Sequence, residues 1–169
     1  MMIFYKYICD YILENISLIQ LIIVAIECVS NGIESNNLYI LAGLNEKYDR
    51  SKISLYYQLT LEELNIKEPT KAEASNYLIK YYCNELINKK INPHIFLYQI
   101  FNDIYYKTFD IRKDKIYTGD NFGIENIIGI YFTIDELNEN KINKNIKKEI
   151  EKEYIKCYKE AKKYLKNNK

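Results

Sequence analysis

The sequence has 169 residues, with 24 Lys and Arg against 23 Asp and Glu, 18 Tyr, one His and no Trp. This length fits one domain with a substantial hydrophobic core, and the 48% apolar and 28% charged residues exclude a disordered chain. The net charge of +1, taken over the whole chain, speaks against a protein dedicated to nucleic acid.

Helical periodicity begins at the N-terminus. Apolar residues spaced three and four apart predict a helix over residues 3–15, with a strand over 3–9 as the alternative. A Ser-x-x-Gln capping box at 17–20 predicts that a second helix begins there, and the Asn-Gly pair further on is typical of a helix end. Ser35 is then expected to cap a short helix that reaches Gly43.

The middle of the chain continues the helical pattern. A helix is expected to start at Asp49 or Ser51. A Thr-x-x-Glu capping box at 70–73 predicts the start of the next helix. The Asn-Pro pair at 92–93 predicts an N-cap followed by proline in the first helical position, where its missing amide does no harm.

Residues 108–132 depart from this pattern and are predicted to be irregular, since they hold three of the five glycines, with residues 127–132 as either a short helix or an extended piece. A third capping box at 133–136 predicts that helix resumes there. An apolar stripe from Ile142 to Leu165 then predicts one long amphipathic C-terminal helix. With no internal repeat or linker, the sequence predicts an all-α fold: a single-domain bundle of about six to eight helices over residues 1–169.

The small net charge hides a split between two parts of the chain. Residues 1–140 hold 13 Lys and Arg against 19 Asp and Glu, whereas residues 141–169 hold 11 Lys against four Glu. Three interpretations compete: lysines that pair with neighbouring glutamates, a helix that docks on an acidic body or partner, and a surface for nucleic acid or membranes. Nucleic acid is the least favoured, because such sites favour Arg and this tail has none.

Tyrosine is the second suggestive feature. Eighteen tyrosines cannot all be deeply buried with satisfied hydroxyls, and Tyr is enriched at protein interfaces because it offers rigid apolar area with a polar tip. Codon usage typical of an A/T-rich genome explains part of the excess. The candidate interaction surface therefore combines lysines of the last helix with tyrosines of two earlier helices: Lys144, Lys148, Lys152, Lys156, Lys163, Tyr56, Tyr57, Tyr81 and Tyr82.

Other chemistries find little support in the sequence. The four cysteines are scattered, which predicts small buried thiols rather than a zinc site or a nucleophile: Cys9, Cys28, Cys83 and Cys157. No phosphate-binding loop or hydrolase motif is present, so we expect no metal and no cofactor. The uncharged run at 15–26 is shorter than the roughly 20 residues that span a bilayer, so we expect a cytoplasmic protein without a membrane span.

The segment from Gly32 to Leu64 resembles a known group. Its Gly-x-x-Ser-x-x-Leu-x-x-Leu-Ala-Gly-Leu stretch, followed by a helix that ends in Glu-Leu, is similar to small bacterial all-helical proteins, and the likeness covers about residues 20–108. Asn65 stands where the group has Gly, which changes the helix cap. The resemblance implies a helical fold, and the group itself has no established function. Some small bacterial proteins of this sort look like immunity proteins, which neutralise a toxin, and this suggests an immunity-like role.

The sequence thus predicts a non-enzymatic protein-binding module, with an immunity or regulatory role and another protein, such as a toxin, as its partner. One alternative is an enzyme with a dispersed carboxylate acid/base site between Asp110 and Glu125. The other is nucleic-acid binding through the Lys-rich C-terminal helix.

Overall fold

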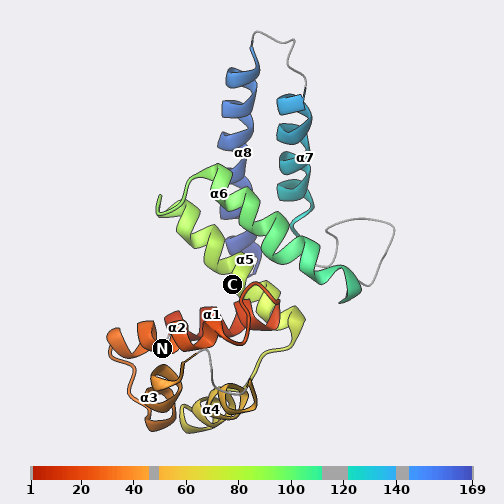
Figure 1. Ribbon diagram of the computed structural model, residues 1–169. Helices are drawn as coiled ribbons and strands as arrows, with labels where there is room; N and C mark the ends of the chain where they lie inside the picture. The colour runs from red at the N-terminus through yellow and green to blue at the C-terminus, as the bar shows by residue number, and fades with distance from the viewer. Residues whose placement is uncertain (1, 46–49, 112–121, 140–144, 169) are drawn as a thin grey trace. The chain divides into compact units, whose positions relative to one another are not determined.

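The computed structural model describes residues 2–45, 50–111, 122–139 and 145–168, without the side chains of residues 2 and 109–111 (Figure 1). These described residues form eight α-helices and no strand, which confirms the predicted all-α fold and its long C-terminal helix. None of the described helices combines the length and the apolar character needed to cross a bilayer.

The chain divides into two compact units, Met1–Ala74 and Ser75–Lys169. The single domain expected over residues 1–169 stays a prediction, because compact units can belong to one domain. The boundary lies near the start of helix α5 (Lys71–Ile87). A continuous helix at a boundary has none of the Pro, Gly or Ser enrichment by which linkers are detected.

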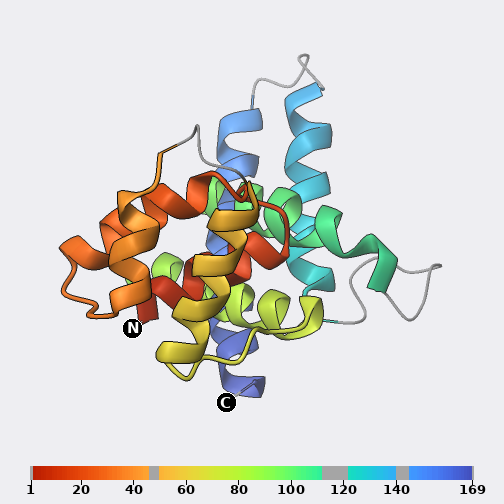
Figure 2. The ribbon, with the colours of Figure 1, turned by 60° about the horizontal axis from the view of Figure 1, so that its bottom comes forward.

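Unit 1 (Met1–Ala74) contains α1 (Met2–Ile12), α2 (Gln20–Ser30), α3 (Asn36–Gly43) and α4 (Arg50–Glu63), which are drawn in red to yellow in Figure 2. The helix predicted at the N-terminus is confirmed as α1, against the strand alternative. Helix α3 packs against both α2 and α4. Apolar and aromatic side chains from all four helices form one core, which includes Phe4, Ile8, Leu21, Ala25, Leu38, Leu41, Ile53 and Tyr57.

Two predicted capping motifs in unit 1 can be compared with the structure. The Ser35 hydroxyl accepts a hydrogen bond from the amide of Leu38 at 3.1 Å, which confirms Ser35 as the N-cap of α3. Only one of the two hydrogen bonds of the capping box at 17–20 is present. The amide of Ser17 donates to the side-chain oxygen of Gln20 at 2.7 Å, but α2 begins at Gln20 rather than directly after Ser17.

Unit 2 (Ser75–Lys169) contains most of α5 and five further helical segments. These are α6 (Pro93–Tyr98), the π-helical η1 (Gln99–Tyr105), the 3₁₀-helical η2 (Tyr106–Ile111), α7 (Glu125–Glu139) and α8 (Ile146–Asn167). Helices α7 and α8 lie side by side and antiparallel in Figures 1 and 2, and α6 contacts both. Buried side chains of this unit include Leu78, Ile79, Leu86, Phe96, Ile100, Ile104, Cys157 and Ala161.

The capping motifs predicted for α5 and α6 are confirmed. The amide of Thr70 donates to the Glu73 carboxylate at 2.8 Å, and the amide of Glu73 donates to the Thr70 hydroxyl at 3.2 Å, so both halves of the box form. The Asn92 side chain accepts from the amide of Ile95 at 2.9 Å, with Pro93 in the first turn of α6. Each motif satisfies an amide that the helix itself leaves unpaired.

The predicted irregular segment 108–132 ends earlier than expected, because α7 already begins at Glu125, and of the two alternatives for residues 127–132 the helix is confirmed. Thr133 does not start a helix. It lies inside α7, and its hydroxyl donates to the carbonyl of Gly129 at 2.9 Å, a bond available to any mid-helix threonine. Residues 112–121 of the predicted segment lie outside the described residues.

Candidate interaction surface

Helix α8 is packed on unit 2 along one face. Its buried residues are Cys157, Ala161 and Tyr164. The Tyr164 hydroxyl donates to the side-chain oxygen of Asn76 on α5 at 3.4 Å, and Asn126 on α7 donates to the Glu160 carboxylate at 3.0 Å. The burial of apolar residues and these two side-chain hydrogen bonds determine which face of α8 is exposed to solvent.

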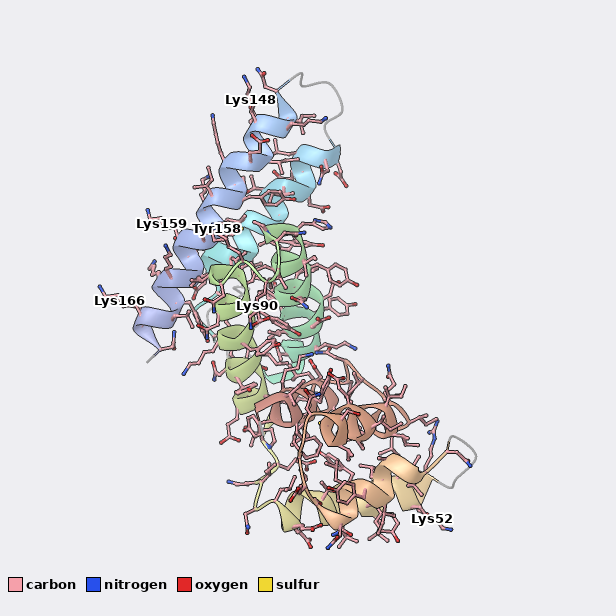
Figure 3. All side chains as sticks on the ribbon, turned by 90° about the vertical axis from the view of Figure 1, so that its left-hand side faces the viewer. Lys52, Lys90, Lys148, Tyr158, Lys159 and Lys166 are labelled. Carbon is pink, nitrogen blue, oxygen red and sulfur yellow. The ribbon has the colours of Figure 1, made fainter. Side chains whose placement is uncertain are left out.

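The opposite face of α8 carries a row of exposed lysines: Lys148, Lys152, Lys159, Lys162 and Lys166. With 3.6 residues per turn, these positions fall within an arc of about 80°, directly opposite the buried Cys157. At 1.5 Å per residue the row is about 27 Å long. Figure 3 shows Lys148, Lys159 and Lys166 pointing outward, away from α7. We call these five residues the outer lysine row.

Ile155 interrupts the outer lysine row near its middle. Its side chain is 70% exposed, one of the largest exposures of an apolar residue in the described part of the chain. Among the described residues, the five lysines form no ion pair. The row is therefore a strip of lysines without ion pairs to described residues around an exposed apolar side chain, arranged on a helix that packing holds in place.

Two lysines beside the outer lysine row differ from it because they are paired. The ammonium of Lys156 lies 2.6 Å from the Glu153 carboxylate, and that of Lys163 lies 3.8 Å from Glu160. Such i,i+3 pairs lie along the sides of a helix. Lys156 and Lys163, predicted from the sequence as surface residues, are thus exposed but locally neutralised.

Of the lysines predicted from the sequence, Lys148 and Lys152 belong to the outer lysine row, and Lys144 lies outside the described residues. The remaining members, Lys159, Lys162 and Lys166, were missed. They follow an alternation of three- and four-residue spacings around the exposed Ile155, and that alternation is the sequence signal that finds them.

The predicted tyrosines do not form part of this surface. Tyr57 and Tyr82 are buried, at 2% and 3% exposure, so the prediction that they lie on a surface is wrong. The Tyr57 hydroxyl is satisfied inside unit 1 by the Glu68 carboxylate at 3.0 Å, which shows how a buried tyrosine can still bond its polar tip. Tyr56 and Tyr81 are half-buried.

The cysteines have no reactive environment. All four are buried and free, as the sequence predicted. Burial raises the pKa of the Cys9, Cys83 and Cys157 thiols to about 12, and at Cys9 the charge of Asp10 raises it further. Within the described ranges, no group of three or more His, Cys, Asp or Glu side chains could hold a metal ion.

Most carboxylates of the acid/base site predicted between Asp110 and Glu125 lie outside the described residues. Residues 112–121 and the side chain of Asp110 lie outside the description. Glu125 lies in the first turn of α7 with its side chain exposed, where a carboxylate favours the positive end of the helix.

No protein-family model matches the chain, and no match was found among the curated proteins or the solved structures. The resemblance over residues 20–108 to small bacterial helical proteins therefore stays a prediction.

Proposed function

We propose that this chain is a non-enzymatic protein-binding module that docks on an acidic surface of another protein through the outer lysine row of α8. The observation that carries this proposal is the row itself: five exposed lysines without ion pairs to described residues, on both sides of the 70%-exposed Ile155.

The composition of the row favours a protein partner over nucleic acid. Protein interfaces combine an apolar centre with a polar rim, and Ile155 among lysines has that arrangement. Base recognition relies on the bidentate geometry of Arg, whereas lysine offers a point charge, and α8 contains no Arg. Lysines alone attract phosphates without reading a sequence.

The energetic roles of the two kinds of side chain differ. Burying Ile155 against a partner contributes about 1.5–3 kcal/mol, while each exposed ion pair contributes about 0.2–1 kcal/mol. Complementary charges mainly raise the association rate and select the partner. We therefore assign affinity to Ile155 and its surroundings, and partner choice to the lysines.

Within this class, we propose an immunity-like role, in which the acidic partner is a toxin, or a regulatory role. Support for the immunity role comes from the resemblance in residues 20–108, and support for an acidic partner comes from α8. The two proposals can be tested separately. An acidic partner that is not a toxin would contradict the immunity role but not the docking of α8 on an acidic surface.

The test compares two matched triple variants of the full chain as bait in nuclease-treated extract of its host. Lys152→Gln, Lys159→Gln and Lys162→Gln remove three charges from the outer lysine row. Lys147→Gln, Lys156→Gln and Lys163→Gln remove three charges from the rest of α8. Both variants have the same net charge.

We expect wild type and the control triple to retain the same acidic protein, and the outer-row triple to lose it. Equal retention by both triples would place the interface elsewhere. Retention that occurs only in extract without nuclease treatment, or that is specific for DNA or RNA, would contradict a protein partner.

A further inference from the structure

A small pocket opens between α6, α7 and α8, all within unit 2, on a different part of the surface from the outer lysine row. Its volume is about 110 Å³. Residues from the three helices line it: His94, Leu97, Tyr98, Tyr131, Ile134, Asp135, Asn138 and Tyr154. Every one of these residues belongs to the described part of the chain.

The pocket has an apolar floor and aromatic walls. Leu97 and Ile134 are buried, at 4% and 6% exposure. Each of the three helices contributes one tyrosine: Tyr98 from α6, Tyr131 from α7 and Tyr154 from α8. Tyrosine rings carry negative charge on their faces, so a small space lined by three tyrosines offers aromatic surface that a cation can use.

One wall is fixed before any ligand arrives. The Tyr131 ring stacks on Phe101 at 3.9 Å between centroids and 6° between planes, and Phe101 stacks in turn on Tyr105 at 5.3 Å. Both partners lie in the π-helical η1, which directly follows α6. Single turns of π-helix occur frequently at functional sites, and here the wide turn supports a pocket wall.

The charge of the lining is suited to a cation. Asp135 is the carboxylate of the lining, and no Lys or Arg is among the lining residues. The pKa of Tyr131 is raised, first by burial and then by the negative charge of Asp135. The field of that carboxylate therefore reaches the aromatic wall, where it would add to the attraction of the rings for a positive guest.

We propose that this pocket binds a methylated ammonium group. A primary ammonium needs acceptors for three N–H bonds, whereas a methylated one presents C–H surface to the rings and to Leu97 and Ile134. Tyrosine cages that hold such groups by cation–π attraction are a general form of recognition. A cavity of about 150 Å³ accepts benzene, so about 110 Å³ suits a single methylated ammonium head.

Two sources share this chemistry: a free molecule such as choline, and a methylated lysine side chain of a protein. The test is a calorimetric titration of the full chain at pH 8 with three probes. These are choline, a short peptide that contains trimethyllysine, and 3,3-dimethylbutan-1-ol, which replaces the choline nitrogen by carbon and has no charge.

We expect choline or the peptide to bind with a dissociation constant in the millimolar range or tighter, and the neutral alcohol to bind at least about fivefold more weakly. The probe that binds more tightly identifies the source. Equal binding of choline and the alcohol would overturn the proposal, and so would the absence of heat from both cations at up to about 50 mM.

Matched control variants distinguish a loss of cation binding in the pocket from a general loss of folded protein. Asp135→Asn and Tyr98→Leu should each weaken cation binding about fivefold. Glu136→Gln is the charge control, because Glu136 is exposed beside Asp135 but does not line the pocket. Tyr106→Leu is the aromatic control, because Tyr106 is 72% exposed and lies outside the pocket. Unchanged binding in Asp135→Asn, or equal losses in the controls, would contradict the assignment.

Discussion

The carboxylate of Glu63, at the end of α4, accepts a hydrogen bond from the hydroxyl of Ser35 at 2.7 Å, at the start of α3. It also accepts the amides of Asn36 at 2.8 Å and of Asn37 at 3.0 Å. The side-chain amide of Asn37 donates as well, at 2.8 Å, so four donors at the positive end of α3 converge on one carboxylate. The contact ties the end of α4 to the beginning of α3 within unit 1.

Glu63→Gln should lower the melting temperature of the protein by a few degrees, because a neutral amide is a weaker acceptor for these donors. Glu62→Gln is the control, since the neighbouring carboxylate is exposed and has no such contacts. Thermal unfolding by circular dichroism at pH 7 measures both. A melting temperature of Glu63→Gln equal to that of Glu62→Gln would contradict the contact.

The same contact predicts a pH dependence. Hydrogen bonds from Asn37, Ser35 and Asn36, in that order, lower the pKa of Glu63 from its ordinary 4.5 to about 2. Because the pKa is depressed in the folded state, the stabilisation is fully present above pH 4.5 and is lost as the pH falls towards 2. Between these values, wild type should lose its advantage over Glu63→Gln. A constant difference across this range would speak against an ionised Glu63.

Leu78→Ala should reduce stability, whereas Ile155→Ala should reduce partner binding. Leu78 is fully buried in α5, so its truncation should reduce the free energy of unfolding by about 2–5 kcal/mol. Ile155 is 70% exposed, so Ile155→Ala should leave stability within about 0.5 kcal/mol of wild type, yet weaken partner binding. Urea unfolding and binding assays separate the two effects. A large loss of stability in Ile155→Ala would mean that Ile155 is part of the fold rather than of the interface.

The cysteines should resist alkylation while the protein is folded. Burial raises the pKa of all four thiols, that of Cys28 to about 11 and the others to about 12, so almost no thiolate exists at pH 8. Iodoacetamide should label the native chain slowly and the urea-unfolded chain at four sites. Fast labelling of any one cysteine in the native protein would reveal a local opening.

Sequence reasoning succeeded where one short stretch of chain decides the outcome. The capping residues Ser35, Thr70 and Asn92 bond to amides three residues away, so a few consecutive residues are enough to predict where each helix begins. The same pattern at Thr133 was misleading, because a threonine inside a helix bonds the carbonyl four residues back instead. The packing around the residue decides whether such a side chain caps a helix or lies inside one.

The outer lysine row was predicted in part for a geometrical reason. Equal steps of four residues advance 40° beyond a full turn each time, so a series from Lys148 through Lys152 to Lys156 drifts off the outer face. The row instead alternates steps of three and four. Which face is outer also depends on the buried contacts of Cys157 and Ala161 with the rest of unit 2.

The aromatic pocket was not predicted. His94, Tyr131 and Tyr154 come from three helices that are far apart in the sequence, and periodicity within one helix contains no information on how three helices meet. The division into two compact units has no signal in the sequence either, because it lies inside the continuous helix α5.

The most direct test of the central claim is the dissociation constant of the purified chain with its captured acidic partner, measured for wild type and for the two matched lysine triples. We expect the outer-row triple to bind about tenfold more weakly than the control triple at about 50 mM salt, with the difference shrinking as the salt rises to about 200 mM. Equal dissociation constants for the two triples, or a difference that salt does not change, would contradict docking through the outer lysine row.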